Sequence, residues 1–224
     1  MNNRVIKFLL IAILLPILIT GCSSNAGQDD NVAKGNDINE EESIQEKISA
    51  YFPLFEGMHY EYRGEGIEYA SFIRDIKHAS QPLVQIHDNN GGTELATVYK
   101  VEEEMVSIIS RQEEFYSDDN LLPGIDENTE PEEIILKAPL IKGTSWETNE
   151  KRMEIVEIGL ELEVPAGKFF DVIKVKDYLI DRENEMVNYR YYAKNMGLIK
   201  RESIGDNFKV ISELEAYQNK KADW

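Results

Sequence analysis

Apolar and polar residues alternate with a period of two along much of the chain after Gly57, which is the pattern of strands with one buried face. The clearest run places apolar residues on one face and mostly acidic residues on the other: Val156, Ile158, Leu160, Leu162 and Val164. The same alternation recurs in residues 95–101 and 208–216. These segments are predicted to be half-buried strands of an antiparallel sheet.

Short turn sequences separate the apolar runs. Residues 64–66 and 89–92 are rich in glycine or asparagine, and Pro165-Ala166-Gly167 suits a type I turn. About nine to eleven strands follow one another without room for crossover helices, so a meander is predicted.

The strand predicted after Gly167 carries apolar residues on both faces and therefore needs cover on two sides. These residues are Phe169, Phe170, Val172, Ile173 and Val175. The second face can be covered by a helix, or by the sheet curling onto itself into a half-barrel.

One helix is indicated before the strands. Residues 43–46 have the spacing of a capping box, Ile44, Ile48 and Tyr51 fall on one helical face, and Pro53 ends the segment. This is the only good helix signal after the amino-terminal leader.

The fold class predicted from these patterns is mostly β. We expect a single antiparallel meander sheet, strongly curved or half-barrel, with one short N-terminal helix. It forms one domain over residues 43–217, followed by a polar tail at 218–224.

Residues 1–21 have the three parts of an export signal. Arg4 and Lys7 form a basic start, residues 8–19 form an apolar run, and small residues follow. The run is about 12 residues long, whereas a spanning helix needs roughly 20. A cleaved signal is therefore predicted.

The signal ends in Ile19-Thr20-Gly21-Cys22, which resembles the bacterial lipobox. This resemblance implies that Cys22 is diacylated and becomes the new amino terminus, and two acyl chains suffice for stable membrane attachment. Cys22 is the only cysteine, so no intramolecular disulfide, cysteine-based metal site or thiol catalysis is expected.

The chain carries a formal net charge of −18, and removal of Arg4 and Lys7 with the signal makes it more acidic. This charge argues against nucleic acid as a partner and against lying flat on an anionic membrane. Residues 22–42 are polar and acidic, and are predicted to form a flexible tether after the lipidated cysteine.

The histidines and carboxylates of the sequence form no recognisable catalytic or metal-binding motif. His59, His78 and His87 form no zinc-binding pair, and His59 and His87 are expected to be solvated on the polar face of strands. The sequence has no nucleophile elbow and no phosphate-binding loop. Paired carboxylates for glycoside hydrolysis leave no sequence signature.

The acidic segment 118–133 is the most plausible place for a cation. In a calcium loop Asp126, Asn128 and Glu130 would take the first, third and fifth positions, but Pro131 replaces the required glycine and Lys137 the bidentate glutamate. A solvated loop is therefore predicted, with no metal and no cofactor apart from the diacylglyceryl group on Cys22.

Aromatic residues suggest two further roles. A row of tyrosines on one sheet face can stack on sugars or anchor a partner, although tyrosine also simply favours half-buried strands. The residues concerned are Tyr60, Tyr62, Tyr69, Tyr178, Tyr189, Tyr191 and Tyr192. Trp146, after the turn at Gly143, is predicted to lie in the core, and Trp224 to be exposed.

A series of short motifs runs through nearly the whole predicted domain. The motifs are Tyr51-Phe52-Pro53-Leu54, Gly57, Tyr60, Tyr62, Gly64, Gly66, Glu68-Tyr69-Ala70, Ala138-Pro139-Leu140, Gly143, Trp146, Pro165-Ala166-Gly167, Phe169, Tyr192-Ala193-Lys194 and Gly197-Leu198-Ile199-Lys200. Their order is similar to that in a family of uncharacterised lipoproteins from Gram-positive bacteria. The resemblance implies no activity and no assigned site residues, and the family's Gly-Val-Gly turn is replaced by Asn195-Met196-Gly197.

The function expected from the sequence is that of a non-enzymatic lipoprotein on the extracytoplasmic face of the cell membrane. Its domain is expected to bind a protein partner or an envelope ligand. Two alternatives remain: a carrier or sensor of a hydrophobic ligand in a half-barrel cavity, and an envelope hydrolase.

Overall fold

The computed structural model describes residues 48–52, 55–126, 128–182 and 185–221, all of which belong to one compact unit within residues 38–224. The predicted signal, the lipidated Cys22, the tether, the capping box at 43–46 and Trp224 lie outside the described residues. No helix among the described residues is long and apolar enough to cross a membrane.

Twelve antiparallel strands form a single sheet in the described chain, which confirms the mostly β prediction and exceeds the expected strand number by one. Short 3-10 turns lie at η1 (Glu68–Ala70), η2 (Leu122–Gly124) and η3 (Ile180–Arg182). The strands are β1 (Met58–Glu65), β2 (Phe72–Ser80), β3 (Leu83–Asn89), β4 (Glu94–Val101), β5 (Met105–Gln112), β6 (Glu133–Lys137), β7 (Ser145–Thr148), β8 (Lys151–Val164), β9 (Gly167–Leu179), β10 (Met186–Ala193), β11 (Gly197–Gly205) and β12 (Phe208–Asn219).

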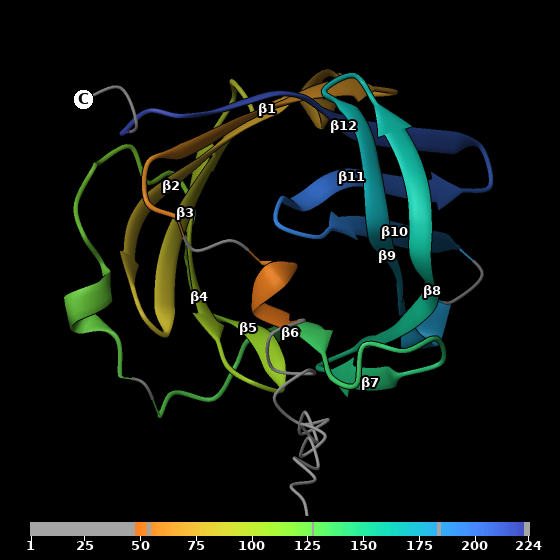
Figure 1. The fold of residues 1–224 in the computed structure, drawn as a ribbon, viewed down its shortest axis with the longest axis horizontal. Helices are drawn as coiled ribbons and strands as arrows, with labels where there is room; N and C mark the ends of the chain where they lie inside the picture. The colour runs from red at the N-terminus through yellow and green to blue at the C-terminus, as the bar shows by residue number, and fades with distance from the viewer. Residues whose placement is uncertain (1–47, 53–54, 127, 183–184, 222–224) are drawn as a thin grey trace, which may run out of the picture. The chain divides into compact units, whose positions relative to one another are not determined.

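The sheet is a meander whose first and last strands are neighbours. Its order is β6-β5-β4-β3-β2-β1-β12-β11-β10-β9-β8-β7, so β1 pairs with β12 in the middle and β6 and β7 are the two edges. The sheet curls until these edges approach each other, giving the nearly closed barrel of Figure 1. The predicted strong curvature is therefore confirmed.

Side chains bridge the seam between the two edge strands. The Trp146 indole Nε1 donates to the Ile134 carbonyl at 3.0 Å, and the Ile134 amide donates to Thr148 Oγ1 at 3.2 Å. Within the described chain β6 and β7 share no backbone ladder. The seam therefore depends on a few side-chain bonds.

A helical turn at residues 48–50 lies inside the curve of the sheet (Figure 1). Ile48 is fully buried, Phe52 packs on Tyr99 with ring centroids 4.9 Å apart, and the Asn195 amide donates to the Ala50 carbonyl at 2.6 Å. The curl of the sheet and the helical turn both cover its inner face. The predicted cover on a second face of β9 is wrong at Phe170, because that side chain is 60% exposed.

The long β8–β9 hairpin corrects one predicted strand face. Ile155 is fully buried whereas Ile158 is 45% exposed, so the predicted single apolar face from Val156 to Val164 is wrong in its first half. The register shifts between Ile155 and Leu160, and Gly159 takes a φ of 66° in this irregular stretch. A bulge adds a residue and therefore exchanges the inward and outward positions.

The barrel has two chemically different ends. At the helix end, the turns at 81–82, 102–104 and 194–196 surround the helical turn, and the β8–β9 tip joins β12 through a bond from the Ala166 amide to the Leu214 carbonyl at 2.9 Å. At the opposite end, called the far end, the chain turns at 66–71, 90–93 and 206–207. Apolar side chains dominate inside the helix end, and charged side chains lie inside toward the far end.

Candidate functional site

An arginine–aspartate pair forms the first part of the charged interior. Arg74 on β2 and Asp88 on β3 are cross-strand partners, and the guanidinium donates to both carboxylate oxygens at 2.7 Å. Burial alone would lower the pKa of Arg74, but Asp88 raises it well above its ordinary value. This bidentate pair leaves Asp88 occupied.

Glu133 on β6 is the centre of a second cluster. Its carboxylate lies 2.7 Å from Arg111, 3.2 Å from Lys151 and 3.4 Å from Arg190. Burial alone would raise the pKa of Glu133, but these three cations hold it below the usual range. Arg190 also lies 3.5 Å from Asp177, so its charge is compensated twice.

Arg201 on β11 is the exception in this interior. It is the direct cross-strand partner of Arg190, and it has no carboxylate within ion-pair distance among the described residues. Its Nε donates to Ser212 Oγ at 3.1 Å, and its guanidinium carbon lies 4.0 Å from the centre of the Phe72 ring. Burial, together with Arg74 and Arg190, lowers its pKa although Asp88 opposes this.

A cavity of about 320 Å³ adjoins Arg201 at the far end. We call it the arginine pocket, and its polar lining comes from neighbouring strands β10, β11 and β12. The loop at 66–71 borders it, because Ser212 Oγ donates to the Ala70 carbonyl at 2.6 Å. The residues used below are Ala70, Asn188, Arg190, Arg201, Ser203 and Ser212.

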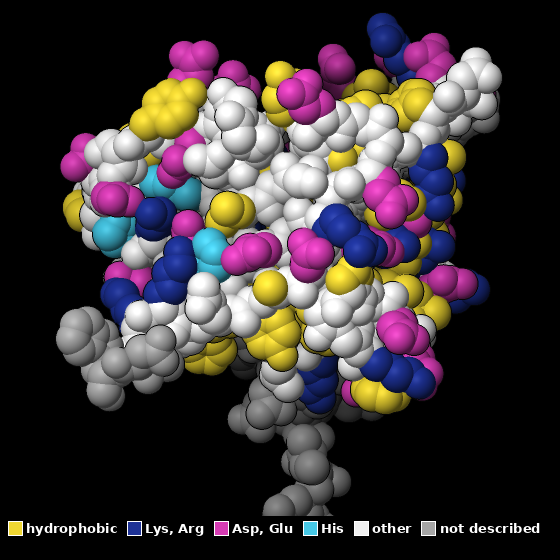
Figure 2. Space-filling view, turned by 90° about the horizontal axis from the view of Figure 1, so that it is seen from above, with side chains coloured by type: hydrophobic (Ala, Val, Ile, Leu, Met, Phe, Trp, Pro, Cys, Tyr) yellow, Lys and Arg dark blue, Asp and Glu magenta, His cyan; other side chains and the backbone are white. Residues whose placement is uncertain are grey.

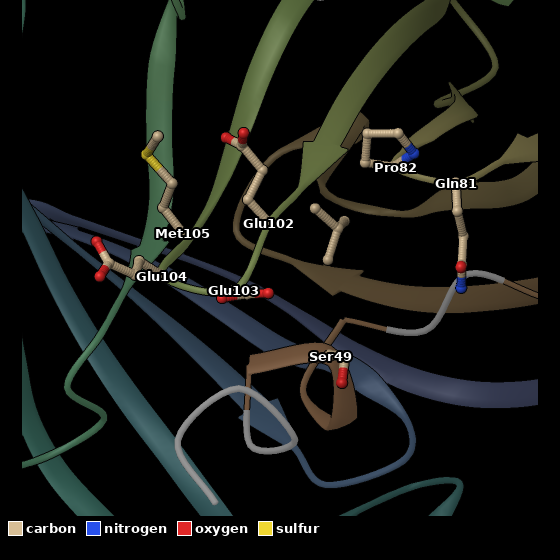
Figure 3. A pocket seen from close by; sticks show the side chains of 8 residues that line it. Ser49, Gln81, Pro82, Glu102, Glu103, Glu104 and Met105 are labelled. Atoms are coloured by element: carbon tan, nitrogen blue, oxygen red, sulfur yellow. The ribbon is translucent and has the colours of Figure 1, made fainter. Parts of the chain in front are cut away.

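A larger cavity of about 640 Å³ lies at the helix end, between the helical turn and the β4–β5 hairpin (Figure 3). Glu102, Glu103 and Glu104 line it together with Ser49. Glu103 and Glu104 are exposed, and Glu102 pairs with Lys100 at 2.8 Å. Solvated carboxylates of this kind lose little hydration on folding and indicate no ligand.

A separate apolar pocket at the helix end is nearly filled by the protein's own side chains. The pocket between Phe52, Tyr62 and Leu198 measures only about 20 Å³, which is room for one water molecule and not for a lipid chain. Tyr60 lines the same pocket, and its buried hydroxyl has no hydrogen-bond partner in the described chain. This packing counts against the hydrophobic-carrier alternative.

The two strand histidines are buried, so the prediction that they are solvated is wrong. His59 is 7% exposed, with Nδ1 2.7 Å from Asp75, and His87 is 2% exposed, with Nδ1 2.7 Å from Glu94. Pairing with a carboxylate lets the ring be buried with its hydrogen bonds satisfied. Figure 2 shows histidine side chains gathered at one side of a face where acidic and basic groups are intermixed.

The acidic segment 118–133 is only partly solvated. Asp118 is 85% exposed in its side chain, but Leu122 packs on Leu83 and Val98, and the Leu121 amide donates to Gln85 at 2.8 Å. Its last residue, Glu133, is buried in the ion-pair cluster already described. Among the described residues, no group of three or more histidine, cysteine or acidic side chains has the arrangement of a metal site.

The aromatic predictions divide between core and surface. Trp146 is 5% exposed and belongs to the core, as predicted. Tyr60, Tyr62, Tyr191 and Tyr192 are buried while Tyr69 is exposed, and they do not form an exposed row. Tyrosine here mainly covers the sheet, as its strand preference alone explains.

The arginines of the interior were not among the predicted site residues. No strand was predicted at Arg190 or Arg201. The two arginines become neighbours only when β10 pairs with β11, and Arg190 is compensated by Glu133, which precedes it by 57 positions. Sequence alternation alone does not give this pairing.

The fold and site define a nearly closed antiparallel barrel with a helical plug at one end and a cationic cavity at the other. No protein-family model matches the sequence, and no curated protein matches it.

Two solved structures are similar. One is from Bacteroides fragilis and is named as an exported protein with a YmcC-like fold, with 13% identity, a TM-score of 0.45, and coverage of 75% of this chain and 98% of that chain. The other is from Parabacteroides distasonis and is named as a lipoprotein, with 12% identity, a TM-score of 0.37 and the same coverage. Likeness at this level carries no inference about function.

Proposed function

We propose that this protein is a lipoprotein anchored through Cys22 on the extracytoplasmic face of the membrane, and that its domain binds a small polar ligand without turning it over. The export signal and the lipobox resemblance support the anchor. The arginine pocket carries the binding proposal, because it is a cavity of about 320 Å³ lined by hydrogen-bonding side chains, whereas the apolar pocket between Phe52, Tyr62 and Leu198 has room for only about 20 Å³.

The anchor is tested in cells with the full chain. Cys22→Ser should move the protein from the membrane fraction to the soluble fraction or leave it unprocessed, whereas Ser23→Ala should leave it in the membrane. A Cys22→Ser protein that stays in the membrane, processed like the wild type, contradicts the anchor.

Ligand binding is tested by native mass spectrometry of the mature lipoprotein released from detergent micelles. We expect a small polar molecule that is lost on denaturation. Ser203→Leu should fill the arginine pocket and abolish this extra mass, whereas the matched change Ser145→Leu on an exposed edge strand should not. An extra mass of lipid size, or turnover of an envelope substrate abolished by one carboxylate substitution, overturns the proposal.

A further inference from the structure

We infer that the arginine pocket binds an oxyanion, a carboxylate or phosphate group on a small ligand, through Arg201. This inference rests on the proposed function and adds the chemical class of the ligand.

The positive charge of Arg201 beside the pocket is not neutralised by a carboxylate in the part of the chain that the structure describes. Arg190 and Arg201 stand directly opposite each other on neighbouring strands, an arrangement that destabilises a sheet. Glu133 and Asp177 compensate Arg190, and Asp88 is occupied by Arg74, so nothing within ion-pair distance in the described chain compensates Arg201. A bound anion would remove the repulsion between the two arginines.

Hydrogen-bond donors are also left over at this place. A guanidinium has five N–H donors, and within the described chain Arg201 uses only Nε, toward Ser212. Arg190 Nη1 is not such a donor, because it is buried and faces the equally buried Asp177 Oδ2 at 3.5 Å as a loose ion pair. The free donors are therefore those of Arg201, and oxyanion oxygens are the strongest acceptors for a guanidinium.

The other polar groups of the pocket already have partners. Glu202 also lines the pocket, and its carboxylate is neutralised by Lys200 at 3.4 Å and Lys209 at 3.2 Å. Ser203 Oγ donates to Asn188 Oδ1 at 2.7 Å, and Asn188 Nδ2 donates to Asp177 at 3.0 Å. Ser212 accepts from Arg201 and donates to Ala70. The donors of Arg201, and not the hydroxyl or amide groups, therefore remain for a ligand.

Arg201 is held in a fixed orientation before any ligand arrives. Its guanidinium lies over Phe72, and Phe72 stacks on Tyr62 with ring centroids 4.2 Å apart. The Tyr62 hydroxyl donates to the Leu198 carbonyl at 2.7 Å, which fixes the stack. A guanidinium group that is already oriented loses little conformational entropy when it binds an anion.

The experiment uses the mature lipoprotein in zwitterionic detergent and measures binding calorimetrically with three probes: glycerol 3-phosphate, glucuronate and glucose. We expect at least one anion to bind, with an affinity that falls as salt is added, and glucose not to bind. Binding of glycerol 3-phosphate alone assigns a phosphate ligand, and binding of glucuronate alone assigns a carboxylate ligand. Failure of both anions to bind overturns the inference.

Variants connect the binding to the site. Arg201→Gln should weaken anion binding by about tenfold or more, in keeping with the loss of a charge-assisted hydrogen bond. Arg201→Lys, which keeps the charge without the planar fork, should weaken it several-fold and serves if the glutamine variant does not fold. Arg152→Gln makes the same change at an exposed ion pair and should bind like the wild type.

The outcomes separate this inference from the proposed function. If Ser203→Leu removes the native ligand but Arg201→Gln and Arg201→Lys bind as tightly as the wild type, the binding function stands and the anion inference fails. If no ligand and no probe binds, both fail.

Discussion

Glu133 shows how one side chain can hold distant parts of this molecule together. Its carboxylate is 5% exposed and contacts cations from β5, β8 and β10, which belong to both halves of the barrel. Losing one member of a buried ionic group leaves the others uncompensated, which costs about 3 kcal/mol or more. Glu133 therefore stabilises the seam region from inside.

Glu133→Gln should lower the free energy of unfolding by about 3 kcal/mol near neutral pH. The folded-state pKa of Glu133 is lowered, so its contribution is present above the unfolded value of about 4.3 and is lost as the pH falls through the lower folded pKa. The difference between wild type and variant, measured by urea unfolding, should shrink below about pH 4. The exposed Glu161→Gln should show little difference at any pH.

Arg190 and Arg201 should differ in what they contribute to stability. Arg190→Gln removes a partner of two buried carboxylates and should cost about 3 kcal/mol. Arg201→Gln removes repulsion as well as a hydrogen bond, and should change the free energy of unfolding by less than about 1 kcal/mol. If urea unfolding gives the same loss of unfolding free energy for both variants, the charge of Arg201 must be neutralised in the folded state.

At the scale of elements, the sequence predicts where strands form, but it predicts only in part which side of each strand is buried. The period-two pattern gave the antiparallel sheet because one-sided burial is a local property of each strand. The β8 faces failed near Gly159 because a bulge exchanges the two faces without altering composition. The histidines were misplaced because their carboxylate partners come from other strands or from distant positions.

Gly159→Ala tests the irregular stretch of β8. The glycine has a φ of 66° and a Cβ there would meet nothing within 4 Å, so the cost is purely conformational, about 1 kcal/mol. Gly124→Ala is the matched control, since that site is also open but does not have a positive φ, and its stability should not fall. Thermal or urea unfolding measures the stability of both variants. An equal loss of stability in the two would contradict a conformational cost specific to Gly159.

Thr148→Val tests the seam with almost no change of volume. The variant leaves the Ile134 amide without its Oγ1 acceptor and should cost about 1 kcal/mol. Amide hydrogen exchange at Ile134 should become faster, while exchange in the central strand β1 stays unchanged. Thr129→Val, at an exposed loop position, should alter neither measurement.

At the scale of the whole molecule, an acidic exterior encloses a cationic cavity. The net charge of −18 is visible in the composition, but the uncompensated arginine is not, because it depends on which strands become neighbours. The composition therefore predicts an acidic protein but does not indicate that the arginine pocket is positively charged.

Salt should stabilise this protein. Raising the ionic strength from about 0.01 M to about 0.15 M shortens the screening length from about 30 Å to about 8 Å and weakens repulsion among the excess carboxylates. The thermal midpoint should rise across this range, because the buried ion pairs are screened much less than the surface. A falling midpoint would show that exposed ion pairs outweigh the repulsion.

The pairing of β1 with β12 has a consequence for the order of assembly. Strands β1 to β6 and β7 to β12 each form a continuous run of neighbours, and the only ladder joining the two runs in the described chain is made by the first strand and the last. Joining strands so far apart in the chain is a slow, late step of folding. A chain emerging amino end first must keep β1 unmatched on one side until the final strand appears.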